Sequence, residues 1–268
     1  MWRLLITDPA PGPWNMAVDE AVARCAADGL SPTTLRFYQW QPGAVSLGRH
    51  QPLADIDRGQ VERLGYGLVR RPTGGRAILH IDELTYSIAG RAEDEALQGA
   101  VLDSYNRLSE GLVLGLRRLG LEAAKAPATN RAGPDVSPVC FEVPSAYEII
   151  IGPHKIMGSA QSRRGGYVLQ HGSLPLHGEI TRLVEVLAVG EEAEREGLRR
   201  TLRQRAATVE TLLGRRVTFW EAATVLIDGL SSALGIDLEP GELTPAELDL
   251  AHRLEAETFA HPAWLERV

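Results

Sequence analysis

The alternation of apolar and turn-forming residues divides the first part of the chain into short elements. Residues 2–6 predict an opening strand, and a helix is expected over about residues 15–27. Its apolar positions fall at the spacing of one buried helix face: Val18, Val22, Cys25 and Ala26. Cys25 is therefore expected to be a core residue. The aromatic-rich residues 34–40 predict a strand, with residues 43–48 as its expected partner.

The middle of the chain mixes strand-like and helical patterns. After a short helix, strands are expected over residues 75–80 and 83–88. Apolar residues then recur at helical spacing over residues 101–119, and Gly120 marks the expected end of this long helix. Residues 126–139 contain many turn formers and little periodicity, which predicts a loop.

Three antiparallel strands separated by glycine-containing turns are predicted next: residues 147–151, 155–162 and 167–176. Two helices are then expected: residues 191–213 and 218–234. No linker is clean enough to divide the chain. We therefore predict one domain over residues 1–268, with a sheet-containing core over residues 1–178 and a mostly helical portion over residues 179–268.

Composition and charge narrow the class of protein. No window approaches 18 consecutive apolar residues, so no segment is expected to span a membrane. A formal net charge of −7 argues against a nucleic-acid-binding protein, although arginines cluster locally, for example over residues 199–205. Two cysteines of unlike context do not form a disulfide framework, and the first residues lack a signal peptide. A cytoplasmic protein is expected.

The most informative pair of residues is Cys140 and Lys155. The sequence has only two lysines but 26 arginines, so a lysine inside an apolar, strand-like segment suggests a role that arginine cannot perform. An ammonium group can release a proton, and a thiol can become a nucleophile, so the pair indicates covalent acyl chemistry. The alternatives are a buried structural cysteine and a surface lysine. The proline-bounded loop around Cys140 and the scarcity of lysine favour the reactive interpretation.

A second candidate segment runs from Arg70 to Arg76. Its paired glycines, Gly74 and Gly75, would let backbone N–H groups approach a ligand, while arginines supply charge for a phosphate or carboxylate. A plain turn with solvated arginines explains the segment equally well. Thr73 belongs to the same stretch.

Histidines and small residues mark three further positions. For His80 the favoured interpretation is a core histidine, because its strand alternates with apolar residues. His171, followed by Gly172, ends a strand and either lines a pocket or lies in the core. The small residues Gly158, Ser159 and Ala160 suit a strand that comes close to a ligand or another backbone. Neither a P-loop nor metal-ligand spacing is present, so no metal or cofactor is expected.

These motifs together resemble the biotin/lipoate protein ligase and octanoyltransferase superfamily along nearly the whole chain. Residues 12–20 are similar to its N-terminal helix, residues 35–48 to its first hairpin, and residues 70–87 to its acyl-binding signature. Residues 140–148, 155–161 and 169–173 most resemble the cysteine-dependent octanoyltransferase branch. The resemblance implies an α+β fold with a mixed, largely antiparallel central sheet flanked by helices.

The resemblance also implies a reaction. Octanoyl would pass from acyl carrier protein to a lysine of a lipoyl-domain protein, typically the glycine-cleavage H protein, with Cys140 as nucleophile and Lys155 as its activator. Residues 70–80 would wall the acyl tunnel. Substrate contacts are expected from the following residues: Arg70, Arg71, Thr73, Gly74, Gly75, Arg76, His80, Gly158, Ser159, Ala160, His171 and Gly172. The family is often monomeric.

Two departures from the family pattern matter. Arg76 stands where ATP-using lipoate ligases usually carry a third glycine, and those enzymes lack a cysteine matching Cys140, so both features point away from adenylation. Ile81 is inserted where the family commonly has His followed directly by Asp. Three alternatives remain: an ATP-dependent lipoate ligase, an amidotransferase between lipoyl domains, and a catalytically silent acyl-binding protein.

A docking face for acidic carrier proteins is a further hypothesis. Acyl carrier protein and lipoyl domains are generally acidic, so arginine clusters on an otherwise acidic protein are candidates to bind them. The proposed face consists of Arg163 and Arg164 together with Arg70, Arg71 and Arg76.

Overall fold

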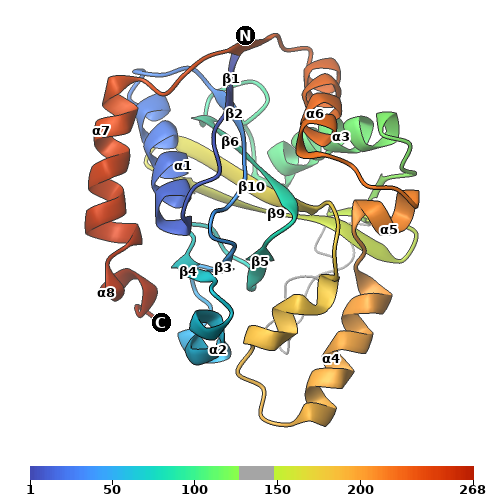
Figure 1. Cartoon of the computed structure of the whole chain (residues 1–268). Coiled ribbons are helices and arrows are strands. Elements are labelled where there is room, and N and C mark those ends of the chain that lie inside the picture. Colours follow the sequence, from blue (N-terminus) through green and yellow to red (C-terminus); the bar gives the residue numbers. More distant parts are fainter. Residues whose placement is uncertain (127–147) are drawn as a thin grey trace.

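The computed structural model describes residues 1–126 and 148–268 and contains two sheets packed among helices (Figure 1). The larger sheet has eight strands, in the spatial order β11, β1, β2, β6, β10, β9, β8, β7. Their bounds are β1 Trp2–Ile6, β2 Thr34–Tyr38, β6 Glu83–Arg91, β7 Ala124–Lys125, β8 Ile149–Ile151, β9 His154–Arg164, β10 Tyr167–Pro175 and β11 Leu238–Pro240. Only β11, β1 and β2 run parallel, so the mixed, largely antiparallel sheet is confirmed.

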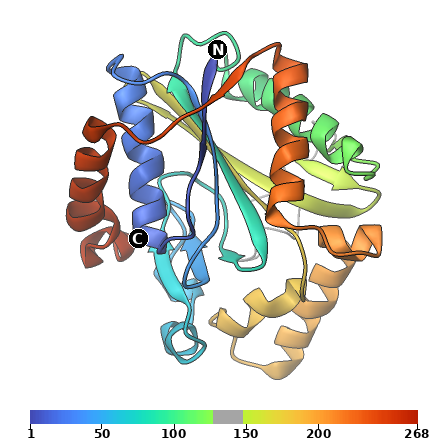
Figure 2. The same ribbon diagram turned by 45° about the horizontal axis from the view of Figure 1, so that its top comes forward.

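Helices cover both faces of this sheet (Figures 1 and 2). The helical elements are α1 Gly12–Ala27, η1 Leu53–Asp55, α2 Arg58–Arg63, α3 Val101–Arg118, η2 Ile180–Val186, α4 Glu192–Arg205, α5 Val209–Leu213, α6 Phe219–Leu234, α7 Pro245–Leu254, η3 Glu255–Phe259 and α8 Pro262–Leu265. The pair α3 and α6 lies on one face, and the pair α1 and α7 lies on the other. Both faces of the central strands are therefore buried.

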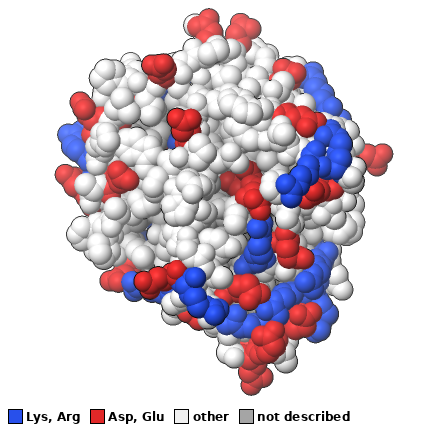
Figure 3. Space-filling model, viewed as in Figure 1, with Lys and Arg blue, Asp and Glu red and all other residues white. Residues whose placement is uncertain are grey.

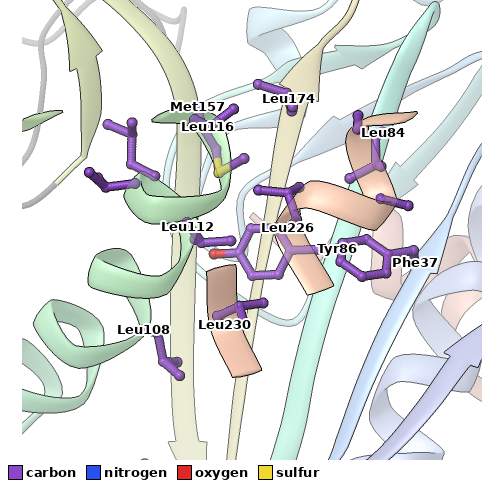
Figure 4. Packing of buried hydrophobic residues seen from close by; sticks show 14 of the residues in the cluster. Phe37, Leu84, Tyr86, Leu108, Leu112, Leu116, Met157, Leu174, Leu226 and Leu230 are labelled. Atoms are coloured by element: carbon purple, nitrogen blue, oxygen red, sulfur yellow. The ribbon is translucent and has the colours of Figure 1, made fainter. Parts of the chain in front are cut away.

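Side-chain alternation on β2 shows how the strands serve two cores. Leu35 and Phe37 point into the cluster beneath α3 and α6, which Figure 4 shows closely packed around Tyr86, Leu112 and Leu226. The alternate residue Arg36 is also fully buried, on the face covered by α1. Apolar side chains thus fill one face, while the α1 face admits buried polar groups.

The smaller sheet has three strands in the order β4, β3, β5: β4 Gly67–Arg70, β3 Ala44–Leu47 and β5 Ile78–His80. The expected pairing of residues 34–40 with residues 43–48 is therefore wrong. Both edges of β2 are occupied, by β1 and β6, so β3 pairs instead with β4 and β5. The second sheet packs its apolar residues against η2 and α4.

Other expected elements have mixed outcomes. The three antiparallel strands β8, β9 and β10 are confirmed, and α3 ends where Gly120 adopts a φ of +97°. The single helix expected over residues 191–213 is wrong, because it is divided into α4 and α5. Ala206 is extended there and bridges to β9, and the Thr208 hydroxyl then accepts a hydrogen bond from the Thr211 N–H to begin α5.

Surface charge on the face shown in Figure 3 is mixed. Basic side chains gather near the lower end, around α4, with acidic side chains among them. Arg199 contacts Glu185, Glu192 and Glu196, and Arg203 lies 3.8 Å from Glu179 and Glu196, so these two arginines of the cluster are paired within the protein. No helix among the described residues is long and apolar enough to cross a membrane.

The close crossing of α3 and α6 depends on glycine. A Cβ added at Gly229 would lie 2.3 Å from the Gly115 nitrogen and 2.4 Å from the Gly111 oxygen, so the helices would have to separate. We expect Gly229→Ala to lower the free energy of unfolding by about 1–3 kcal/mol, the usual cost of overpacking.

The matched control for this substitution is Gly197→Ala on α4, where an added Cβ meets no atom within 4 Å. Because alanine favours a helix over glycine, this variant should gain up to about 1 kcal/mol. Urea unfolding of both variants measures the difference. Equal effects of the two substitutions would contradict the packing argument.

Candidate active site

A cavity of about 550 Å³ lies between the two sheets. The larger sheet contributes residues of β9 and β10, with Thr85 of β6 and Tyr38 of β2, and the smaller sheet contributes Ser46, Ile78 and His80. The side chains of Met16 of α1 and Trp40 add apolar surface to the wall of the cavity. Aromatic and aliphatic side chains combined with a few converging polar groups are typical of a small-molecule site.

Most of the expected substrate-binding residues line this cavity: Arg71, Gly74, Gly75, Arg76, His80, Gly158, Ser159, Ala160, His171 and Gly172. Arg70, Thr73 and Lys155 are buried beside it and do not line it. Cys140 lies outside the described residues, so its expected role as nucleophile stays a prediction.

The Gly74–Gly75 loop is held from inside by Arg71. The Arg71 guanidinium donates to the carbonyls of Ser46, Gly74 and Arg76 at 2.8–2.9 Å. Gly75 has a φ of +97°, which favours glycine, and a Cβ on Gly48 would lie 1.8 Å from the Gly75 oxygen. The loop therefore has a fixed path over the cavity.

Arg70 and Arg71 cannot form a docking face, and that part of the hypothesis is wrong. Both are buried, Arg70 with 0% of its surface exposed. Arg70 donates to the carbonyls of Gly48, Gln51 and Leu265, which ties the C-terminal segment to the small sheet. Five fixed N–H donors make a guanidinium suitable for this internal role.

Lys155 is fully buried, which excludes a surface lysine. Its Nζ donates to Glu148 Oε1 at 2.6 Å, and Glu148 lines the cavity. One extra residue of β9 opposes the Ile149–Ile150 step of β8, and such a bulge redirects side chains along the strand. The Lys155 carbonyl also accepts from the Ala207 N–H at 3.3 Å, so residues after α4 hold its backbone.

His80 is buried, as the core interpretation predicted, yet it also lines the cavity. Its ring stacks on Trp40 at 4.0 Å between centroids, and Nε2 lies 2.8 Å from Ser46 Oγ. Burial lowers the pKa of His80 below its usual value despite the opposing effect of Glu83. The imidazole is therefore neutral near pH 7.

His171 joins a buried network centred on Asp19. Asp19 Oδ1 accepts from Arg36 at 2.8 Å and from Ser87 at 2.7 Å, and Oδ2 accepts from Tyr38 at 2.8 Å. His171 Nδ1 lies 3.3 Å from Asp19 Oδ2, while its Nε2 lies 2.6 Å from Thr73 Oγ1. Thr73 precedes the Gly74–Gly75 loop, so the network connects α1 to that loop.

The pKa of Asp19 reflects this network. Burial alone would raise it, but the hydrogen bond with His171 and the charge of Arg36 lower the pKa below its usual value. Asp19 is therefore a carboxylate whose charge is compensated inside the protein.

Gly172 allows β9, β10 and β6 to pack tightly beside the cavity. A Cβ at this position would lie 2.5 Å from Ser159 Oγ and 2.6 Å from the Tyr86 ring. Tyr86 and Ser159 are hydrogen-bonded beneath it at 2.7 Å, and burial raises the pKa of Tyr86 to about 12. Tyr86 is thus a neutral phenol at ordinary pH.

Several site residues were not expected from the sequence. Glu148, Asp19 and Glu83 are buried carboxylates, and Glu83 accepts hydrogen bonds from Ser173 and Thr85. A carboxylate directly beside an apolar run, as at Glu148, was the available signal. No group of residues suited to hold a metal ion occurs in the described parts of the chain.

The fold and the cavity between its two sheets place this protein in one class, the catalytic domains of the lipoate-ligase type. The family model described as the lipoyl protein ligase A/B catalytic domain matches residues 11–231, and the chain belongs to this family. The resemblance noted in the sequence is thereby confirmed.

Individual relatives are similar over nearly their full length. An octanoyltransferase LipM of Symbiobacterium thermophilum is 42% identical, covering 98% of this chain and 97% of the relative. That of Bacillus subtilis is 37% identical over 98% and 97%. Among solved structures, the bipartite lipoate protein ligase of Thermoplasma acidophilum has a TM-score of 0.83 and 28% identity, covering 99% of this chain and 96% of that one.

Acid should weaken the Asp19 network. Because its pKa is lowered in the folded protein, Asp19 contributes stability above its unfolded pKa of about 3.9, and this contribution is lost as the pH falls through the folded value. Asp19→Asn should cost about 3–5 kcal/mol at pH 7, because Arg36 loses its buried partner.

Free energies of unfolding measured from about pH 7 to 3 should therefore converge for the wild type and Asp19→Asn toward acid pH. Asp228→Asn, which alters an exposed residue of α6, serves as the control. A constant gap between wild type and Asp19→Asn across this range would show that the charge of Asp19 is not what stabilises the site.

Proposed function

We propose that this protein is an octanoyltransferase of lipoate assembly, which attaches an octanoyl group to a lysine of a lipoyl-domain protein. The observation that carries the proposal is the buried Lys155–Glu148 pair beside a largely apolar cavity. Support comes from the LipM relatives, which carry the name octanoyltransferase at up to 42% identity. The archaeal ligase is described together with its E2 lipoyl domain, which supports a protein acceptor.

The proposed donor is octanoyl-acyl carrier protein, and the reaction has two steps. The Cys140 thiolate attacks the thioester carbonyl, the bond to the carrier sulfur breaks, and the carrier thiol leaves with a proton. The acceptor amine then attacks the acyl-cysteine, an amide forms, and Cys140 is released as the thiol. No nucleotide is required, because the thioester is already activated. The glycine-cleavage H protein as acceptor and a monomeric, cytoplasmic enzyme are part of the same proposal.

Lys155 has the proton-transfer role in this scheme. An ammonium close to Cys140 would favour the thiolate, and the amine can accept a proton from the incoming lysine. Glu148 fixes the position of Nζ at 2.6 Å. Arginine could supply the charge but not the proton acceptor.

The cavity suits the acyl chain. Tyr38, Trp40 and Ile78 form apolar wall, and burial of each methylene contributes about 0.8 kcal/mol. An eight-carbon chain would thus gain several kcal/mol, which is a physical basis for chain-length preference.

The likeness to the archaeal ligase favours a second candidate, an ATP-dependent lipoate ligase. In that case the Gly74–Gly75 loop would contact an acyl-adenylate. Higher identity to the octanoyltransferases and the arginine at position 76 favour the first candidate. Dependence on ATP separates the two.

Intact-protein mass spectrometry tests the thioester. Mixed with octanoyl-acyl carrier protein and no ATP, the wild type should gain one octanoyl group that hydroxylamine removes, and Cys140→Ala should gain none. Cys25→Ala is the matched control: Cys25 is buried, and burial raises the pKa of its thiol. An adduct that persists in Cys140→Ala, or product formed only with ATP and free acid, would exclude this mechanism.

The two lysines provide a second matched pair. Lys155→Met should lower the rate of octanoyl transfer by about 10²- to 10⁴-fold, the usual contribution of a general acid–base group. Lys125→Met removes a partly exposed lysine that pairs with Glu110, and its rate should stay within a few-fold of wild type. Rates are measured with purified carrier and acceptor proteins. A Lys155→Met enzyme that is folded and fully active would contradict the role of Lys155.

A further inference from the structure

A second hollow of about 480 Å³ lies at the far end of α1, beneath the C-terminal segment. We call it the arginine pocket, defined by Arg24, Arg164 and Arg267, which line it, and by Arg49 beside them. Glu20 and Glu257 are its acidic lining residues. The C-terminal segment reaches it because α7, with η3 directly after it, packs along α1 (Figure 1).

Two of these arginines lack a directly paired carboxylate in the described part of the chain, although the charge of Glu20 acts on Arg49. Arg49 and Arg267 form no ion pair among the described residues, and their guanidinium groups lie 5.7 and 4.5 Å from the centre of the Trp264 ring. Trp264 is itself fixed, because its Nε1 donates to the Arg70 carbonyl at 2.8 Å. Burial, together with the charges of Arg164 and Arg267, lowers the pKa of Arg49. Like charges are therefore gathered at one place.

Glu20 does not neutralise the cluster. Its carboxylate already accepts from Arg24 at 2.9 Å, from Arg164 at 2.6 Å and from Tyr167 at 2.7 Å. The exposed Glu257 is the other acid, so the three lining guanidinium groups, with Arg49 beside them, share two carboxylates. Gathered like charges repel one another unless an anion binds between them.

The arginine pocket adjoins the acyl cavity. Met16 of α1 lines the cavity, and Glu20 and Arg24 follow at steps of four residues on the same helix face. On β9, Ala160 lines the cavity and Arg164 lines the pocket from the same side of the strand, about 13 Å further along. Arg49 also directly precedes the cavity residue His50.

We propose that the arginine pocket binds a phosphate group. Guanidinium groups match phosphate oxygens with paired, charge-assisted hydrogen bonds. The pocket is larger than a bare phosphate and leaves room for an organic substituent, so a phosphate ester fits. Two sources share this chemistry: the phosphodiester of the donor's phosphopantetheine arm, and free inorganic phosphate. The first rests on the proposed function and is favoured by the position beside the acyl cavity.

Calorimetric titration with inorganic phosphate, in a buffer without other oxyanions, tests the site itself. The full-length wild type should bind one phosphate saturably. Arg49→Gln and Arg267→Gln should each weaken binding at least tenfold, whereas Arg216→Gln, which alters an exposed arginine outside the pocket, should not. Absence of saturable binding, or equal binding by both pocket variants and wild type, would overturn the proposal.

Two small donors distinguish the sources. Acylation of Cys140 by octanoyl-phosphopantetheine should show a lower KM than acylation by octanoyl-pantetheine, and Arg267→Gln should remove most of that difference. If Arg267→Gln loses phosphate binding but keeps the donor preference, the pocket serves free phosphate. If neither donor acylates Cys140, the proposed function fails, while the titration still decides whether the phosphate site exists.

Discussion

The buried carboxylate of Asp19 is the constraint on which the site depends. A charge removed from water costs several kcal/mol unless partners replace the lost hydration. Here Arg36, Tyr38 and Ser87 come from two neighbouring strands, and His171 comes from a third. Any displacement of α1 from the sheet would leave this charge uncompensated. The register of helix against strands is therefore specified by electrostatics as well as by apolar packing.

The same network reaches the smaller sheet. His171 is hydrogen-bonded to Thr73, and Arg71 holds the loop that follows Thr73. The two sheets consequently meet at fixed polar contacts, and the cavity between them is preformed. A preformed cavity lowers the ordering cost of binding an acyl chain. Rigid polar contacts hold the two sheets together at the edge of the cavity, and apolar side chains form its walls.

Local patterns predicted much of the fold, whereas pairing between distant segments was harder. Glycine turns and apolar runs sufficed for β8 to β10, because those strands pair with their sequence neighbours. The partner of residues 34–40 was missed because β2 pairs with β1 and with β6, and the paired residues of β6 lie far along the chain, as at Phe37–Tyr86 and Tyr38–Thr85. Sequence spacing does not reveal which edge of a strand is already occupied.

The sequence predicted only part of the candidate site, for a similar reason. Glycines and histidines near the cavity were found from local motifs, but the burial of Arg70 and Arg71 was not, because arginine is usually a surface residue. Their carbonyl acceptors come from separate segments, including Leu265 near the C-terminus. The scarcity of lysine was the better signal of a site residue. The chain uses arginine for structural charge, buried or exposed, yet it retains a buried lysine at position 155. Guanidinium stays protonated in proteins, so of the two cationic side-chain types only lysine can also act as a proton acceptor.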